Sequence, residues 1–526
     1  MKNAVEIYDT TLRDGSQGEG ISFSVEDKLR IAKKLDWLGV HFIEGGWPCS
    51  NPKDMEFFAK AKDLKLQHAR LAAFGSTRRA NTPAAQDRNL QALIASGAET
   101  VTIFGKTWDL HVRDVFKTTL EENINMIRDS VKFLKENGKR VIYDAEHFFD
   151  GYKSNPEYAI LTCRTAAEAG AETVVLCDTN GGSLPSQVAD AVRKMNAALG
   201  GVRLGIHTHN DGGMAVANAV SAVEAGATQV QGTINGCGER CGNADLIAII
   251  PNLQLKLGFP CIPAENLKRL TDTSVFVGEV ANMVLQDNQP YVGRSAFAHK
   301  GGVHIDAVQK NRVTYEHIDP ALVGNHQRLL ISELMGKTRI IEMAKELNID
   351  LTKSDPRTDE ILKEVQQLEH EGYHFESAEA SFELLLRRKM KNTSKFFECK
   401  NAKVDTDQIG DSNSNSTATV ILSINGKDLK PVSRVGDGPV NALDLALREA
   451  LAPHYPSLND MHLADFKVRV LDPQAATGAK VRVLIESRDK EDVWTTVGVN
   501  TNIIEASWKA LVDSIEYKLL KDEEAK

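Results

Sequence analysis

Eight short apolar runs alternate with helical stretches over the first 233 residues, and this alternation strongly limits the possible folds. The runs recur at intervals of roughly 25 to 40 residues, and amphipathic patterns such as 25–39 and 120–138 lie between them. Eight consecutive strand–helix units predict a (β/α)8 TIM barrel, with a doubly wound open sheet as the weaker alternative. The runs are VEIY, HFIEG, RLAAF, TVTIF, RVIYD, TVVLC, RLGIH and QVQGT.

The chain of 526 residues is longer than one ordinary domain. We expect a catalytic barrel over 1–275, a helical linker region over 276–395 and a C-terminal α+β regulatory domain over 396–526. Within the linker, 288–308 predicts a glycine-rich loop that leads into a helix, and the charged stretch 353–391 predicts a helical connector.

The C-terminal module contains a weak internal repeat, because 435–451 and 497–514 each place a helix after strand-like segments. The polar segment 407–418 predicts a surface loop. One face of the last helix predicts core packing rather than a ligand cage, and it consists of Ile504, Trp508, Leu511, Ile515 and Leu519.

Composition limits the partners and the compartment. The net charge of −9 comes from interspersed charges, so no basic patch predicts nucleic-acid binding and no lysine-rich helix predicts membrane binding. No run approaches the about 18 apolar residues of a membrane span, and the start MKNAVEIYDT lacks a leader pattern. The seven scattered cysteines favour reduced thiols. We therefore expect a cytoplasmic protein whose partners are small molecules and other copies of itself.

Polar side chains gather where the predicted strands end, which is where the active sites of such barrels lie. A solvated rim would also be polar, but it would not place charges at strand ends so regularly, so we favour one shared site. The residues, in strand order, are Asp9, Arg13, Asp14, Glu44, Lys106, Asp144, Glu146, Asp178, Thr179, His207, His209, Asn235, Glu239, Arg240 and Asn243.

A metal site is predicted from GIHTHND and DTTLRDG. His207 and His209 are two residues apart, so on a strand both rings point to the same face, and the distant Asp14 could close a His2Asp site. An isolated H-x-H is also compatible with core histidines, and the strand-end residues around it favour the metal. Such a site leaves room for a chelating 2-oxo acid and water, and it accepts Mn, Mg, Co or Zn.

Arg13 and Thr179 have the chemistry to bind that acid. Arg13 would reach the developing alkoxide, and Thr179 could donate a hydrogen bond to the substrate carboxylate. The alternative for Arg13 is an ion pair with Glu146 that closes the top of the barrel. GCGERCG departs from the dinucleotide-binding spacing and follows the eighth strand, so it predicts a turn that presents Glu239 and Asn243 near the metal.

Together, DTTLRDGSQ, GIHTHND and NGCGERCGN resemble the superfamily of acyltransferases and lyases that includes 2-isopropylmalate, homocitrate and citramalate synthases and hydroxymethylglutaryl-CoA lyase. HKGGVHIDAV and the C-terminal module extend the resemblance to nearly the whole chain. Residues 14–54 and 502–520 most resemble the citramalate synthase branch. The resemblance implies condensation of acetyl-CoA with pyruvate, release of CoA, a place in isoleucine biosynthesis and inhibition by isoleucine.

The resemblance also implies residue roles, transferred by matching motif. Asp14, His207 and His209 would bind the metal, with Asn243 close to it. His304 in HKGGVH and Tyr315 in NRVTYE would come from a neighbouring subunit, so the active site would be shared across a homodimer. From the residues alone, a structural hydrogen bond is the alternative for His304. The expected pyruvate contacts are Arg13, Thr179, Tyr143 and Phe104, and the expected catalytic residues are Arg13, Glu146, His304 and Tyr315.

Two other functions stay open at this point. A 2-isopropylmalate synthase would use the same metal and acetyl-CoA chemistry on a branched 2-oxo acid, and a few wall residues would decide between them. A non-catalytic amino-acid sensor would use the C-terminal module to bind its effector, but the full set of strand-end residues disfavours a degenerate barrel.

Overall fold

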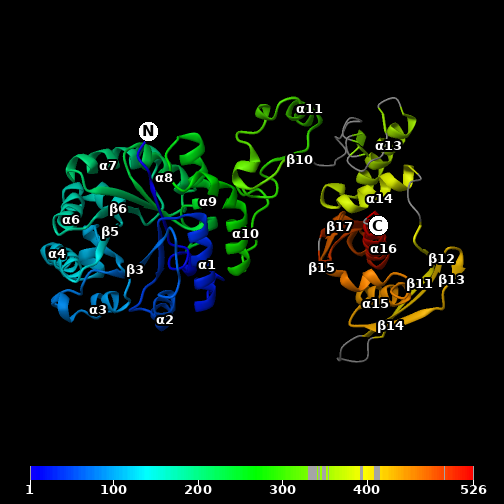
Figure 1. Ribbon diagram of the computed structural model, residues 1–526, viewed down its shortest axis with the longest axis horizontal. Helices are drawn as coiled ribbons and strands as arrows, with labels where there is room; N and C mark the ends of the chain where they lie inside the picture. Colours follow the sequence, from blue (N-terminus) through cyan, green and yellow to red (C-terminus); the bar gives the residue numbers. More distant parts are fainter. Residues whose placement is uncertain are drawn as a thin grey trace. The chain divides into compact units, whose positions relative to one another are not determined.

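The computed structural model describes residues 2–329, 340–341, 344–345, 351–352, 355–390, 395–407, 415–490 and 492–524. The chain forms two compact units (Figure 1). The first comprises 1–297 with 316–327, and the second comprises 298–315 with 328–526.

The first unit is a closed barrel of eight parallel strands, in which β8 pairs back to β1. This closure confirms the predicted (β/α)8 fold over the open sheet. The strands are β1 (Glu6–Asp9), β2 (Phe42–Gly46), β3 (Arg70–Ser76), β4 (Thr100–Lys106), β5 (Arg140–Glu146), β6 (Thr173–Asp178), β7 (Arg203–Thr208) and β8 (Gln229–Gly232).

Helices cover the outside of the barrel, and Figure 1 shows them as the ring around the strands. The predicted helical stretches are α1 and α4. In α1, Ser24 and Asp27 form a reciprocal capping box, and Gly39 ends the helix in a left-handed conformation. The helices are α1 (Val25–Leu38), α2 (Pro52–Ala61), α3 (Arg88–Ala95), α4 (Leu120–Glu136), α5 (Phe148–Ser154), α6 (Pro156–Glu168), α7 (Pro185–Ala198), α8 (Ala215–Glu224), α9 (Leu246–Pro251) and α10 (Leu270–Val280). None of the helices in the described ranges is long and apolar enough to cross a membrane.

Alternation along the strands divides the barrel core into two layers. A small inner cluster fills the barrel below the site, and it consists of Tyr8, Phe42, Ala72, Ile142, Val175 and Cys177. A much larger cluster lies between strands and helices, and it includes Ile7, Ile43, Val141, Tyr143 and Val174. Position along a strand therefore decides whether a side chain can reach the barrel interior.

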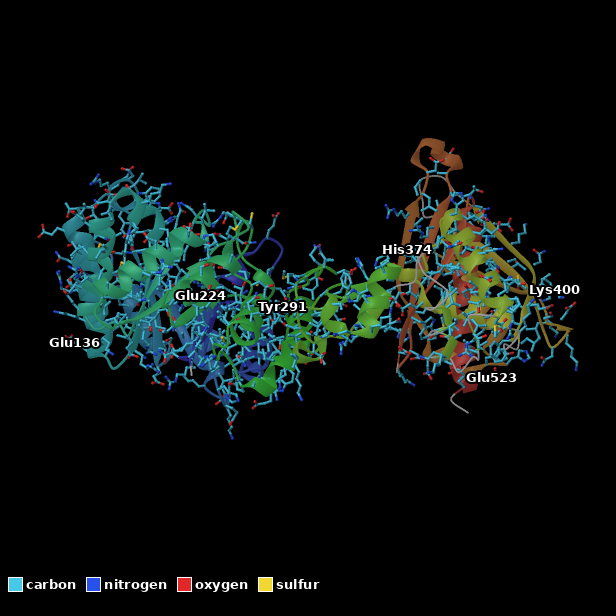
Figure 2. The ribbon with its side chains drawn as sticks, turned by 90° about the horizontal axis from the view of Figure 1, so that it is seen from above. Glu136, Glu224, Tyr291, His374, Lys400 and Glu523 are labelled. Atoms are coloured by element: carbon cyan, nitrogen blue, oxygen red, sulfur yellow. The ribbon has the colours of Figure 1, made fainter. Side chains whose placement is uncertain are left out.

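After the barrel, the chain stays attached to the first unit through Tyr291, which is labelled in Figure 2. Its hydroxyl donates to Asn252 Oδ1 at 2.8 Å, and its carbonyl accepts from Asn325 Nδ2 at 3.0 Å. The predicted loop and helix at 288–308 are confirmed, because the short strand β9 (Ala298–His299) leads into α11 (Gly302–Lys310). β9 pairs in parallel with β10 (Arg328–Leu329).

The second unit contains two antiparallel sheets, each followed by a helix, which confirms the weak repeat. The elements are β11 (Glu398–Asp407), β12 (Asn415–Ile424), β13 (Lys427–Asp428), β14 (Val432–Gly436), α15 (Pro439–Leu451), β15 (His462–Val470), β16 (Val481–Arg488), β17 (Val493–Asn500) and α16 (Ile503–Glu524). On α16, Leu511, Ile515 and Leu519 are buried, and Ile504 and Trp508 pack against the same core.

Two predictions for the second unit need correction. The segment 353–391 is more than a connector, because α13 (Pro356–Glu371) and α14 (Glu379–Met390) form a core with β17 through fully buried Ile361, Phe382 and Leu386. The predicted loop 407–418 is shorter, since Asp407 ends β11 and 415–418 begin β12, whose alternate side chains are buried. Residues 408–414 lie outside the described residues.

Candidate active site

A cavity of about 250 Å³ opens at the C-terminal ends of the barrel strands. Its wall combines charged groups with three aromatic rings and brings together most of the residues predicted from strand ends. The lining residues are Arg13, Asp14, Gln17, Trp47, Phe74, Phe104, Asp144, Glu146, Cys177, Thr179, His207, His209, Glu239 and Arg240.

Asp14, His207 and His209 form a cluster in which one ligand atom of each lies within 4.8 Å of the others. Asp14 follows β1, His207 is on β7 and His209 follows it, so the two-residue spacing places both rings on one side, 5.2 Å apart. The His207 Nε2 atom lies 3.2 Å from Asp14 Oδ2. All three side chains are buried, and in the described part of the chain this is the one such group of three metal-ligating residues.

Charge and burial act differently on the three groups. Burial alone would raise the pKa of Asp14, but the Arg13 cation and His207 outweigh it and hold that pKa well below its usual range. Burial likewise opposes the raised pKa of His207, which the hydrogen bond and charge of Asp14 produce. Burial, followed by the nearby His207, lowers the pKa of His209 to about 4. The cluster therefore offers a charged carboxylate beside a neutral imidazole at neutral pH.

The turn after β8 places Asn243 beside His209, with which it forms a β-bridge. Gly238 has a positive φ of 155°, and a Cβ there would lie 2.2 Å from Asn243 Nδ2, so this turn requires glycine. Asn243 Nδ2 donates to the Cys237 carbonyl, whereas its buried Oδ1 has no hydrogen-bond partner among the described residues. Two imidazoles, a carboxylate and this amide oxygen are a donor set that fits a divalent cation.

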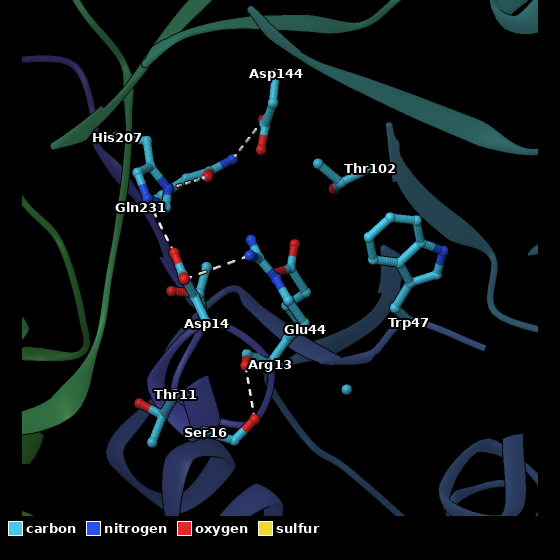
Figure 3. Close-up of polar contacts among 12 residues, drawn as sticks. Thr11, Arg13, Asp14, Ser16, Glu44, Trp47, Thr102, Asp144, His207 and Gln231 are labelled. Atoms are coloured by element: carbon cyan, nitrogen blue, oxygen red, sulfur yellow. Dashed lines mark hydrogen bonds and ion pairs between the residues drawn. The ribbon is translucent and has the colours of Figure 1, made fainter. Parts of the chain in front are cut away.

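Arg13 pairs with Glu44 rather than Glu146, so the alternative of an Arg13–Glu146 ion pair is excluded. Its Nε lies 2.5 Å from Glu44 Oε1, and its guanidinium stacks 3.7 Å from the centre of the Phe74 ring. The Tyr8 hydroxyl donates to Glu44 Oε2 at 2.7 Å. Glu146 instead forms an ion pair with Lys106. Glu44 and the Phe74 ring therefore hold the Arg13 side chain in place (Figure 3), and its remaining N–H groups can point into the cavity that it lines.

Thr179 is oriented by the backbone of His147, the residue that follows Glu146. His147 has a left-handed conformation with φ 57°, which is strained for a residue other than glycine. Its N–H donates to Thr179 Oγ1 at 2.9 Å. Because Oγ1 accepts this bond, the hydroxyl proton of Thr179 can point into the cavity.

The structure also brings forward side chains to which the sequence assigned no role. Trp47 packs edge-on against Phe74 and Phe104, with ring centres 5.7 Å apart in each pair, and these rings form an aromatic wall. Gln231, fully buried on β8, accepts from His207 and donates to Asp144. The one sequence feature that could have drawn attention to Gln231 is that it is a polar residue within the predicted buried strand QVQGT.

The expectation that Tyr143 contacts pyruvate needs correction. Its side chain lies in the outer layer between strands and helices and does not line the cavity. On β5, inward positions alternate through Ile142, Asp144 and Glu146, so Tyr143 faces outward and packs beside Gly105. His304 and Tyr315 belong to the second unit, where their rings stack at 4.2 Å. Their contribution to the barrel site stays a prediction.

The closed barrel and the buried His2Asp cluster at the C-terminal ends of its strands together define a class of enzyme. Comparison with family models identifies that class. Residues 4–277 match the HMGL-like family model, 291–372 match the homocitrate synthase post-HMGL domain-like model, and 376–519 match the LeuA allosteric (dimerisation) domain. The first match covers more than half of the chain, which therefore belongs to the HMGL-like family.

Full-length relatives narrow this membership further. The (R)-citramalate synthase of Aquifex aeolicus is 55% identical, over 100% of this chain and 99% of the relative. That of Geobacter sulfurreducens is 53% identical, over 99% and 98%. A 2-isopropylmalate synthase of Methanocaldococcus jannaschii is 32% identical, over 99% and 96%. Within the family, the chain belongs with the (R)-citramalate synthases.

Proposed function

We propose that the protein condenses acetyl-CoA with pyruvate and water to give (R)-citramalate and free CoA. The observation that carries the proposal is the full-length similarity, at 47 to 55% identity, to five (R)-citramalate synthases. The cavity supports it, because it joins a candidate metal site to an arginine, a threonine and a carboxylate at the end of one barrel.

Asp14, His207 and His209 would hold a divalent cation, with Asn243 near it. When bound, the cation acts as a Lewis acid that polarises the keto group of the 2-oxo acid. The protein groups determine the orientation of that acid. Arg13 donates to the oxygen that becomes negative during attack, and Thr179 donates to the substrate carboxylate.

Glu146 lines the cavity and is our proposed partner of His304 in proton transfer. One of these two groups removes a proton from the acetyl methyl group, the resulting carbanion forms a bond to the keto carbon, and water then cleaves the thioester. His304 and Tyr315 would be supplied by a second copy of the chain. Mixing inactive His304→Ala with inactive Asp14→Ala chains should then restore partial activity, and no recovery despite subunit exchange would contradict the shared site.

The aromatic wall supports pyruvate as the acceptor. Trp47 is fixed by a hydrogen bond from its indole N–H to Asn89 Oδ1 at 2.8 Å, and a second bond joins its backbone N–H to Asp54. Because Trp47 is held at both ends, the wall cannot easily retreat from a branched side chain. A wall fixed in this way supports an acceptor that carries a methyl group rather than an isopropyl group.

We further propose that isoleucine inhibits the enzyme through the module over 396–526, within the domain division 1–275, 276–395 and 396–526. The match of 376–519 to an allosteric (dimerisation) domain supports a regulatory and oligomeric role. Isoleucine should lower activity without competing with pyruvate, and purely competitive inhibition would contradict a separate effector site.

All seven cysteines are free thiols, which supports a reducing compartment such as the cytoplasm.

The decisive experiment measures products by mass spectrometry from acetyl-CoA with pyruvate, 2-oxoisovalerate, 2-oxoglutarate or glyoxylate. Each acid is offered with manganese or with chelator. Metal-dependent citramalate, well above the other products, is expected. Preference for 2-oxoisovalerate would instead indicate a 2-isopropylmalate synthase, and no product from any acid would favour a non-catalytic amino-acid sensor.

A further inference from the structure

A hydrogen-bonded chain runs beneath the candidate metal site and links it to a carboxyl group in the cavity wall. Gln231 forms its centre: its Oε1 lies 2.8 Å from His207 Nδ1, and its Nε2 donates to Asp144 Oδ1 at 3.0 Å. Figure 3 shows the amide between these two partners, with His207 turned toward Asp14 on its other side. Gln231 has no solvent exposure, and His207 and Asp144 are 5% and 4% exposed.

The polarity of this chain determines which nitrogen of His207 is free. A side-chain amide has one donating end and one accepting end. The donating end faces the Asp144 carboxylate, so the accepting oxygen faces His207 Nδ1, which must then carry a proton. Without a cation, Nε2 donates its own proton to Asp14 Oδ2 at 3.2 Å. When a cation displaces that proton, Nδ1 keeps its hydrogen and the lone pair of the neutral ring is on Nε2, beside the Asp14 carboxylate. A flipped amide would present its N–H groups to Nδ1 and select the opposite tautomer.

We propose that Gln231 is a positioning residue that fixes His207 as the Nδ1–H tautomer for metal binding, and that Asp144 holds the Gln231 amide in the required orientation. The proposal rests on the metal site of the proposed function and adds a group that none of the sequence motifs marked. Hydrogen bonds to the outer nitrogen of a ligating histidine commonly fix its ring and raise its basicity.

The same strand provides a matched control. Gln229 lies two residues before Gln231 on β8, and it is 1% exposed. Its Nε2 donates to Glu6 Oε2 at 3.2 Å, toward the opposite end of the barrel. Substitution at 229 therefore removes a buried glutamine from the same strand without touching His207.

The test measures Mn²⁺ affinity of the full-length protein by isothermal titration calorimetry, so the readout does not depend on turnover. Gln231→Met should weaken Mn²⁺ binding by about 10- to 100-fold, whereas Gln229→Met should change it less than about 3-fold. Near-ultraviolet circular dichroism of each variant checks that the barrel stays folded. Unchanged Mn²⁺ affinity in folded Gln231→Met would overturn the proposal.

A double variant separates orientation of the histidine from simple packing. In Asp144→Asn with Gln231→Glu, the new carboxylate accepts from His207 Nδ1 and the new amide donates to that carboxylate, so the polarity at His207 is preserved. This variant should recover most of the Mn²⁺ affinity lost in Gln231→Met. Affinity as low as in Gln231→Met would show that the acceptor is not what matters. If the unsubstituted protein itself bound no Mn²⁺, the metal site of the proposed function would fail as well, whereas an unaffected Gln231→Met refutes only this inference.

Discussion

Substitution of Glu44 tests whether the ion pair beneath the cavity holds Arg13 in place. Glu44 has no solvent exposure, accepts from the Tyr8 hydroxyl at 2.7 Å and pairs with Arg13 Nε at 2.5 Å. Removing one member of a buried pair costs about 3–5 kcal/mol of folding free energy. Glu44→Gln keeps the shape and one accepting oxygen, so we expect the lower end, about 3 kcal/mol.

The reaction should also slow, because Arg13 would retain only Asp14, with Nη1 3.5 Å from Oδ1, and the face of Phe74, and would no longer be held in place. Loss of one placed donor to the developing oxyanion typically decreases the rate roughly 100-fold. Hydrogen exchange of peptides from β1 and β2, followed by mass spectrometry, measures stability locally and should become roughly 100-fold faster. Steady-state kinetics with pyruvate gives the second number.

Glu6→Gln is the matched control at the opposite end of the barrel. Glu6 pairs with Arg203 at 2.9 Å, but their side chains are 24% and 40% exposed, so the pair should contribute less than about 1 kcal/mol. Activity should then stay within about 2-fold of the unsubstituted protein. If Glu44→Gln and Glu6→Gln behaved alike in both measurements, the argument that burial makes the Glu44 pair important would be refuted.

Four further outcomes are expected. Asp14→Asn should weaken Mn²⁺ binding by more than about 100-fold and abolish turnover in a folded protein, and substantial metal-dependent activity would contradict its role as a ligand. Trp47→Ala should shift kcat/KM toward 2-oxoisovalerate by about 10-fold relative to pyruvate, and an unchanged ratio would exclude the aromatic wall as a size limit. Burial raises the pKa of Asp9 to about 7. The stability of the unsubstituted protein relative to Asp9→Asn should therefore be greatest below about pH 4 and should decrease by up to about 4 kcal/mol as the pH rises to 7. Hydrogen exchange in β1 should become faster over this range, and a difference between the two proteins that does not change with pH would refute the prediction. A chromogenic thiol reagent should label three cysteines quickly in the native protein and all seven in denaturant. The exposed, fast-reacting thiols are Cys49, Cys241 and Cys399, and the buried, slow-reacting thiols are Cys163, Cys177, Cys237 and Cys261. Fast labelling of more than three thiols in the native protein would contradict this burial.

The order of the fold could be predicted because each barrel strand is a short apolar run followed by a helix with its own boundary signals. The inner and outer faces of those strands were harder to distinguish. Parallel strands covered by helices are buried on both sides, so alternation between polar and apolar residues is weak. Tyr143, an expected pyruvate contact, lies in the outer layer, whereas its neighbours Asp144 and Glu146 line the cavity.

Residues of the candidate site could be predicted where the spacing in the sequence alone indicates their chemistry, as it does for His207 and His209. Asp14 was also matched to these histidines from a distant strand. Ion-pair and hydrogen-bond partners that no motif marks could not be predicted, because strand register in space determines them. Arg13 could have paired with several carboxylates, and the geometry of β1 and β2 selects Glu44. Gln231 has no spacing signature at all, since its significance comes from the two side chains on β5 and β7 that it joins.

The positions of the three clustered side chains also set an order of events during folding. Asp14 follows β1, whereas His207 and His209 lie on or after β7, and β8 must insert between these strands to complete the ring. A cation that requires all three groups can be captured only after nearly the whole barrel has been synthesised and has closed. Its binding free energy then adds to the stability of the closed ring rather than of any open intermediate, so metal supply would influence how much newly made chain reaches and keeps the native state.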